Sequence, residues 1–496
     1  MKFFLRFAFI FLLFSTTFIK NSYATHVAGG EITWKCDGNG KYIFKVNVYR
    51  DCEGILLFQE DTILIQHDFP GIGKIVGRIV SITDVSPSCS STTNRITCNN
   101  IATGNDGTPG SISRYTFITA PIDLAGVPVP PPNGYTIWAV PDCCRTSDIL
   151  NFINAGGDLT LRTKMFRYIS NANPLGNDLS ICYDNSPDFS EPPNTVTYQF
   201  GREFVYSSNS IDKDLDELSY SFDYPLGSGP NDTLQFELGY NLLRPLPRVN
   251  LPSPDPVTGS VSFEPTFSGK FLSVIKVTSR KCGQKVSEIY RDVLIQVLQD
   301  PNPNPLTRNV QPRIDPVFNN KKSYNTTIVA GDTLLFKISI GDSNVSNVPS
   351  LQGIKGYVNG IGMGLENKSL TLCPYPPCAI LNKDQNIGAI TPASQPVFIT
   401  NEVNNGPIDT IGSGYNIQPT LTNPTSDFYF YWPTSCENLK KVDNCGGTES
   451  IIYNFVVTAK DDYCISPGRD IRSFSVTLTV PDFIKDPVIH CVNVAP

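Results

Sequence analysis

Three aspartates at alternate positions, Asp212, Asp214 and Asp216, lie between two runs in which apolar and polar residues alternate. The runs predict β-strands, so the aspartates stand where a strand passes into a loop. Alternate residues of an extended chain face the same side, and carboxylate oxygens are ligands that calcium prefers. The spacing therefore predicts a calcium site, against the alternative of an acidic loop whose carboxylates are simply solvated.

A second loop of this kind begins at Asp342, with Asn344 and Ser346 at the next alternate positions. In both loops a glycine, Gly201 or Gly331, stands 11 positions before the first aspartate. We therefore expect Asp342 to contribute to calcium binding as well, in a loop with fewer carboxylates.

The repetition extends beyond these loops. Residues 271–282 align without a gap on residues 453–464, and each segment is followed by one more alternating strand. The chain contains 40 Pro, 37 Gly, 29 Phe and 21 Tyr against 3 Met, which is typical of strands joined by long turns. The sequence predicts an all-β protein of tandem immunoglobulin-like β-sandwich modules stapled by disulfides.

Residues 1–24 have the features of a secretory signal peptide. Lys2 and Arg6 precede a short apolar run, and Ala24 ends a stretch of small residues suited to cleavage. All 14 cysteines follow it, so we expect disulfides formed in an oxidising compartment. No later stretch has the length of a transmembrane segment. The net charge of −7 and the lack of a basic cluster argue against nucleic acid as a partner.

Changes in composition divide the mature chain. We predict a β-rich N-terminal domain at 25–184, an immunoglobulin- or cadherin-like module at 185–300, and a second such module with a long insertion at 301–486. Residues 487–496 are expected to be a tail or the start of a further module. One short helix is predicted in the first domain, because Ser147 could cap residues 148–155 and two glycines follow.

Two local disulfides are predicted. Cys36 and Cys52 flank a hairpin with an Asp-Gly-Asn-Gly turn, and Cys89 and Cys98 flank a short polar loop. Further pairs within the insertion, Cys373 with Cys378 and Cys436 with Cys445, are interpreted as loop staples, although the three prolines between Cys373 and Cys378 could oppose closure. Cys182 is a candidate partner for Cys143 or Cys144, and the remaining pairings, which involve Cys282, Cys464 and Cys491, stay open.

The sequence lacks the motifs of common hydrolases. The 3 histidines are far apart, and neither a His-Glu-x-x-His nor a Gly-x-Ser-x-Gly motif is present, so we expect no enzyme. Trp138 and Trp432 are the candidate platforms if the protein binds polysaccharide instead. Four Asp-Thr-Leu or Asp-Thr-Ile triplets resemble sites of bacterial O-glycosylation, and they point weakly to these threonines as sugar acceptors: Thr62, Thr233, Thr333 and Thr410.

Several segments resemble the N-terminal region of large secreted Bacteroidetes proteins of the gliding-motility and type IX secretion class. They are the opening Thr25-His-Val-Ala-Gly-Gly-Glu-Ile-Thr-Trp, the segment Val48-Tyr-Arg-Asp-Cys52, and Ser186-Pro-Asp-Phe together with the acidic stretch from Ser210 to Ser221. The acidic stretch is also similar to motifs of cadherin-like repeats. Those secreted proteins usually end in a sorting domain, which this sequence does not contain, so we expect it to be a fragment of a longer surface protein, or a periplasmic protein if none follows.

The resemblance implies a non-enzymatic protein, exported to the outer cell surface, with a structural or adhesive role in gliding motility. A surface glycan or another cell-surface protein is the expected partner. The alternative is an extracellular polysaccharide-binding protein, and calcium is the one cofactor that the residues suggest.

Overall fold

The computed structural model describes residues 27–37, 40–54, 61–87, 96–98, 107–141, 144–193, 195–198, 203–208, 210–250, 253–299, 309, 311–318, 323–342, 354–364, 370–371, 373–382, 412–417, 425–439, 450–461 and 467–480. Their regular structure consists of strands and short 3₁₀ turns, among them η1 (Leu179–Ile181) and η5 (Cys436–Leu439). The all-β prediction is therefore confirmed. Within these residues no helix has the length and apolarity of a membrane span.

Eight strands form a closed circuit of antiparallel pairs, in which each strand pairs with the next and the last pairs with the first. In spatial order they are β1 (Val27–Cys36), β2 (Lys41–Asp51), β5 (Ile112–Thr119), β4 (Ile75–Asp84), β3 (Thr62–His67), β7 (Tyr135–Ala139), β8 (Leu161–Met165) and β16 (Gln284–Leu298). The small strand β6 (Ile122–Asp123) follows β5 and pairs antiparallel with the start of β2 at residues 41–42.

Strand β16 closes this circuit although it follows β8 in the sequence by more than a hundred residues. One of its edges pairs with β8 at residues 287–289 and with β1 at residues 292–293. Its other edge pairs with β15 (Gly269–Lys281), which in turn pairs with β13 (Glu217–Asp223). A single hydrophobic core includes Ile32 and Phe117 of the circuit together with Phe263 and Phe271. The predicted boundary at residue 185 thus falls within one continuous sheet and one core.

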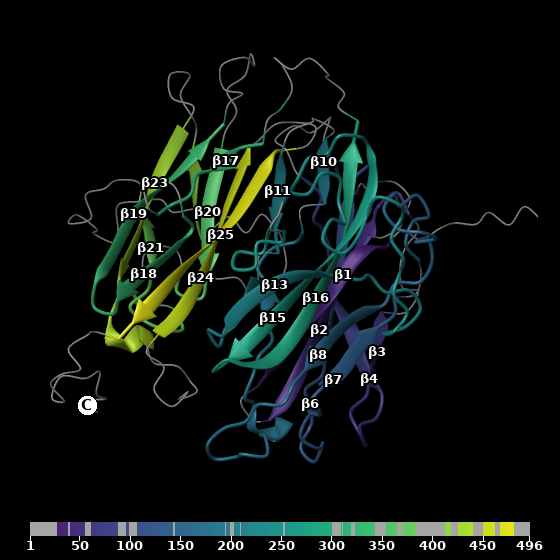
Figure 1. Ribbon diagram of the computed structural model, residues 1–496, viewed down its shortest axis with the longest axis horizontal. Coiled ribbons are helices and arrows are strands. Elements are labelled where there is room, and N and C mark those ends of the chain that lie inside the picture. The colour runs from purple at the N-terminus through teal and green to yellow at the C-terminus, as the bar shows by residue number, and fades with distance from the viewer. Residues whose placement is uncertain are drawn as a thin grey trace, which may run out of the picture.

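We call this unit, from β1 to β16, the N-terminal body (purple to teal in Figure 1). Its remaining strands are β9 (Asp188–Phe189), which pairs with β12 (Ser210–Ile211), β11 (Phe204–Ser207), which pairs with β14 (Ser260–Phe263), and β10 (Val196–Tyr198), which runs parallel to β16.

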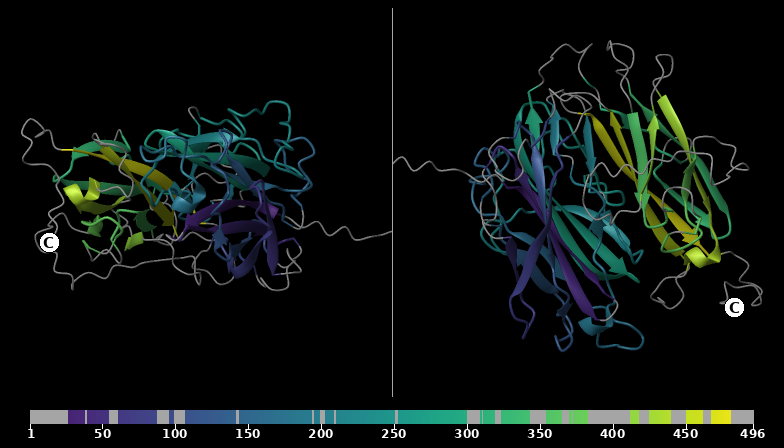
Figure 2. Two further views of the ribbon diagram at one scale, coloured as in Figure 1. Left: turned by 90° about the horizontal axis from the view of Figure 1, so that it is seen from below. Right: turned by 180° about the vertical axis from the view of Figure 1, so that it is seen from behind.

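The C-terminal body packs two sheets against each other (green to yellow in Figures 1 and 2). One sheet contains β17 (Arg313–Ile314), β19 (Thr333–Gly341), β23 (Thr425–Pro433) and β21 (Ile380–Asn382); the other contains β18 (Asn325–Val329), β25 (Arg469–Thr479), β24 (Ser450–Asp461), β20 (Ile354–Gly360) and β22 (Gly412–Ile417). Their facing sides bury an aromatic core in which Phe336 stacks on Phe430 and Phe455 stacks on Phe474. The predicted linker at 300–305 lies outside the described residues.

The two bodies contain the same four-strand arrangement. In the N-terminal body the order is β10–β16–β15–β13, and in the C-terminal body it is β18–β25–β24–β20. In both, the first strand runs parallel to its neighbour and the other pairs are antiparallel. Residues 271–281 of the first aligned segment lie in β15 and residues 453–461 of the second lie in β24, so this strand order supports the repeat that the sequence predicted.

The helix predicted at residues 148–155 is wrong. This segment is irregular and its backbone bonds to distant strands: Ile149 bridges Lys270, and the Leu150 N–H donates to the Lys270 carbonyl. The buried Asn151 side chain bonds both the N–H and the carbonyl of Leu272. These tertiary hydrogen bonds replace the local ones of a helix, which a short segment forms only marginally by itself.

Candidate functional site

The acidic loop between β12 and β13 is a tight turn and not an extended strand. The Asp212 carboxylate accepts the backbone N–H groups of Asp214 at 2.8 Å and Asp216 at 3.2 Å, and the Leu215 N–H lies 3.4 Å from the Asp212 carbonyl oxygen. Leu215 has a φ of 59°, an unusual conformation for a branched residue. The alternation expected of a strand is therefore lost, and the three aspartates do not share one face.

The carboxylates that meet are those of Asp184, Asp214 and Asp216, which can place one oxygen each within 4.8 Å of one another. Asp212 is not in this group because its carboxylate caps its own turn. The prediction that Asp212 lies in one cluster with Asp214 and Asp216 is therefore wrong. Asp342 follows β19 in the C-terminal body, and its predicted site stays a prediction, because Asn344 and Ser346 lie outside the described residues.

Sequence reasoning missed Asp184 altogether. It follows η1, whose neighbouring Cys182 is bonded to Cys36, and this crosslink brings the segment against the end of β1. Asp184 is 2% exposed, and neither of its carboxylate oxygens has a hydrogen-bond partner among the described residues. The next residue, Asn185, fixes Asp214 through its backbone N–H at 2.7 Å and its side-chain amide at 2.9 Å. No spacing rule links position 184 to the acidic motif.

A lysine lies inside the cluster. The Lys281 ammonium is 3.6 Å from an oxygen of Asp214 and 3.6 Å from an oxygen of Asp216, and its side chain is 2% exposed. Lys281 ends β15, directly before a two-residue turn in which Cys282 and Gly283 both have positive φ. Turns of this kind match the twist of a hairpin.

The electrostatics of the cluster follow from burial. Burial raises the pKa of the Asp184 carboxyl well above its usual range; Lys281 opposes this shift, and the neighbouring aspartates add to it. The pKa of Asp212 is also raised, first by burial and then by Asp216 and Asp214. Several carboxylates and one ammonium therefore share a space from which water is largely excluded, where ionised carboxylates repel strongly.

The same loop joins the two bodies. Leu215, between the two clustered aspartates, is 4% exposed and belongs to the hydrophobic core of the C-terminal body. The Tyr375 hydroxyl of that body donates to the Lys213 carbonyl at 3.2 Å. Burial and the acidic cluster raise the pKa of Tyr375 to about 12, so it remains a donor.

A second contact between the bodies is made by Glu191. Its carboxylate accepts hydrogen bonds from Tyr357 at 2.9 Å and Thr458 at 2.8 Å, both in the C-terminal body, and Arg469 lies 4.0 Å away. Its backbone carbonyl accepts from Arg291 of the N-terminal body. Glu191 therefore contacts the interiors of both units, and it is 6% exposed.

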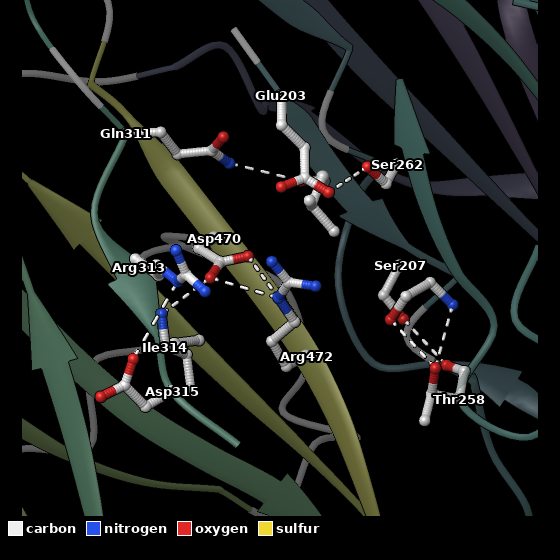
Figure 3. Close-up of polar contacts among 12 residues, drawn as sticks. Glu203, Ser207, Thr258, Ser262, Gln311, Arg313, Ile314, Asp315, Asp470 and Arg472 are labelled. Carbon is white, nitrogen blue, oxygen red and sulfur yellow. Dashed lines mark hydrogen bonds and ion pairs between the residues drawn. The ribbon is translucent and has the colours of Figure 1, made fainter. Parts of the chain in front are cut away.

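Figure 3 shows a third region of this interface, where β25 passes β11. The Gln311 side chain donates to the Val205 carbonyl at 3.3 Å, and the hydroxyls of Ser207 and Ser473 lie 3.3 Å apart. Between Gln311 and Ser207 in Figure 3, Asp470 pairs with Arg472 and accepts the Ile314 N–H at 2.8 Å. The two bodies are thus joined by apolar, polar and charged contacts.

The glycine-rich segment at the start of β1 is buried for structural reasons. A side chain at Gly29 would lie 2.0 Å from the Asp292 carbonyl, so β1 fits between its neighbours only with glycine there. The Glu31 carboxylate accepts hydrogen bonds from Asn47 at 2.8 Å and Tyr49 at 2.9 Å, and it pairs with Arg291 at 3.3 Å. This network ties β1 and β2 to β16.

One small cavity belongs to the N-terminal body. It has a volume of about 40 Å³ and lies on the outer face of β1, β2 and β5, with Lys35, Lys45 and Lys213 around it. The Lys45 ammonium is already bonded to Asp188 at 2.7 Å.

The predicted disulfides of the first domain are wrong in their partners. Cys36 is bonded to Cys182, and Cys52 is bonded to Cys98. Cys36 pairs with Tyr42 next to the hairpin turn, whereas Cys52 follows the other end of β2. Cys52 comes ten residues after Tyr42, so the extended strand places Cys36 and Cys52 roughly 30 Å apart. Cys89 lies outside the described residues. Because Cys182 is bonded to Cys36, it is not the partner of Cys143 or Cys144.

The loop staple between Cys373 and Cys378 is confirmed, with Cα atoms 5.9 Å apart. Tyr375, which contacts the acidic loop, lies within it. Trp432 is 0% exposed and donates to the Pro377 carbonyl at 2.8 Å, so the prediction of a glycan platform there is wrong. Trp138 is half-buried in β7.

Of the predicted glycosylation sites, Thr233 and Thr333 are exposed and Thr62 is partly buried, whereas Thr410 lies outside the described residues. Sugar attachment stays a prediction.

Comparisons with known proteins give little further guidance. No family model matches the chain. No curated protein matches it. Among solved structures, a weak match is dimeric latent PorU from Porphyromonas gingivalis, with 10% sequence identity and a TM-score of 0.19. The match covers 92% of this chain but 34% of PorU, so the chain spans about a third of that protein. At this TM-score the similarity carries no argument about fold or function.

Proposed function

We propose that this chain is a non-enzymatic part of an exported cell-surface protein, in which immunoglobulin-like modules form a rigid body that supports adhesion and, through it, gliding motility. The observation that carries the proposal is the interface between the two bodies. Leu215 of one body is buried in the core of the other, and Glu191 bonds side chains of both. Adhesion loads a surface protein with force, and contacts of this kind would keep the two bodies from moving apart under that load.

The use of the buried polar residues also supports a structural role. Glu31 and Arg291 pair within the N-terminal body, as do Arg145 and Asp292. An active site would leave such groups facing a cavity that a substrate could enter. In the described part of the chain these four side chains are 6% exposed or less and bond one another.

The alternative of polysaccharide binding loses one of its two predicted platforms. Trp432 is 0% exposed in the C-terminal core, so it offers no face to a sugar. Loops with exposed aromatic residues are the usual platforms for sugars.

Export to the surface can be tested directly in the source bacterium. Intact cells would be treated with a protease that cannot cross the outer membrane, and the chain would be detected by an antibody against the N-terminal body. We expect its loss from intact cells while a periplasmic protein survives. Survival of the chain together with the periplasmic control would refute the surface location.

A further inference from the structure

The acidic cluster contains its own cation. Lys281 has its ammonium 3.6 Å from both Asp214 and Asp216, and these carboxylates can approach Asp184 within 4.8 Å. We propose that the Lys281 ammonium takes the place that a calcium ion would have in this loop, and that it makes the joint between the two bodies independent of metal.

The backbone holds Lys281 in this position. Glu217 pairs with Arg280 across β13 and β15, so Asp216 and Lys281, the next residue on each strand, stand side by side at the end of the pair. The turn that follows fixes the direction of the chain, because Cys282 has a φ of 51° and Gly283 a φ of 75°. Since the lysine side chain is 2% exposed, swinging the ammonium out into water requires the hairpin to move.

The ammonium and a calcium ion exclude one another. Calcium takes six to eight oxygens at about 2.3–2.6 Å, and it would have to bind the same oxygens of Asp214 and Asp216 that Lys281 approaches. A divalent ion would then lie within a few ångströms of a buried positive charge, with little water to screen the repulsion. In this loop the Lys281 ammonium therefore supplies the positive charge that neutralises the carboxylates.

The position of Leu215 links the Lys281 charge to the contact between the two bodies. Leu215 lies between the two aspartates that contact Lys281, and its side chain is buried in the C-terminal core. By holding Asp214 and Asp216, the ammonium fixes the turn that presents Leu215. The contact between the bodies then persists in media of any calcium concentration.

Removing the ammonium should convert the cluster into a metal site. Asp184 is 2% exposed and its two oxygens accept no hydrogen bond from described residues, so they are available to a cation. The experiment uses the full chain and terbium(III), a hard cation that replaces calcium and whose luminescence is excited through nearby tyrosines such as Tyr42 and Tyr375. Lys281→Met removes the charge and keeps the length, whereas Lys281→Arg keeps the charge.

We expect Lys281→Met to bind terbium at least about tenfold more tightly than the wild type, because the carboxylate oxygens are then no longer paired with an ammonium that repels the metal ion. Excess calcium should release the terbium, since both ions prefer carboxylate oxygens. Lys281→Arg and the matched control Lys276→Met, from the same strand, should behave as the wild type; Lys276 pairs with Asp223 at 3.2 Å, outside the cluster. No gain in folded Lys281→Met would overturn the proposal. Terbium binding by the wild type that is lost in Asp184→Asn would also overturn it, and this second test does not depend on the folding of the lysine variant.

Discussion

Replacing Leu215 by alanine should loosen the contact between the two bodies. The side chain is 4% exposed within the core of the C-terminal body, and truncation of a buried leucine to alanine costs about 2–5 kcal/mol, including the cavity that remains. Alanine at this position keeps the strain of the positive φ, so no relief offsets the loss. We expect about 3 kcal/mol, the middle of that range.

The loss should fall on the interface first, because Leu215 belongs to a turn of one body and packs in the other. Hydrogen exchange measured by mass spectrometry can locate it, since about 3 kcal/mol corresponds to roughly a hundredfold faster exchange where the exchange rate follows the population of the open state. Peptides that cover residues 185–193 and 211–216 should exchange faster, while those from β3 and β4 should not change.

Leu238→Ala is the matched control, because Leu238 is 100% exposed in the same body and its truncation should leave exchange and the urea midpoint unchanged. A change of less than about 0.5 kcal/mol in Leu215→Ala would refute the reasoning, since that is the range of ordinary surface substitutions. Equal acceleration across all peptides would also refute it, because Leu215 would then stabilise the whole chain and not the joint.

Three further predictions follow from the fold and the cluster. A fragment of residues 25–184 should fail to fold, whereas 25–300 should give a cooperative urea transition monitored by circular dichroism, because β16 closes the circuit; a folded shorter fragment would contradict the circuit. Asp184→Asn should stabilise the protein at about pH 8 more than at about pH 5, because the raised pKa of Asp184 means that stability is lost as pH rises above the ordinary value of 3.8; equal effects in urea unfolding at the two pH values would contradict this. Replacing both Cys36 and Cys182 by serine should cost about 3–5 kcal/mol in urea unfolding, because this bond closes a long loop, and peptide mapping without reduction should find the two linked; a Cys36–Cys52 peptide would contradict the structure.

The sequence was informative where the signal was local. Alternation with period two located β13, since Leu218, Tyr220 and Phe222 face the core as expected. The repeat was found because β15 and β24 are long strands with similar patterns. The all-β class follows from such strands together with the turn-forming composition.

The remaining features depend on pairing between distant residues. Nothing in the local pattern of β16 indicates that it serves both the circuit and the repeated module. Asp184 and Lys281 reach the acidic loop through a disulfide and a hairpin, and neither is visible as spacing along the chain. The helix prediction failed for the same reason, because Asn151 and its neighbours bond to residues far along the chain.

The central claim, that this chain is a rigid element of surface adhesion, is tested most directly by attachment under flow. A strain that lacks the gene would be compared with strains complemented by the wild-type gene, by Leu215→Asp, which places a charge in the core of the C-terminal body, and by the surface control Leu238→Asp, all checked for equal amounts at the cell surface. The account predicts poor attachment of the deletion strain, full rescue by the wild type and the control, and failure of Leu215→Asp. Normal attachment of the deletion strain would contradict the account.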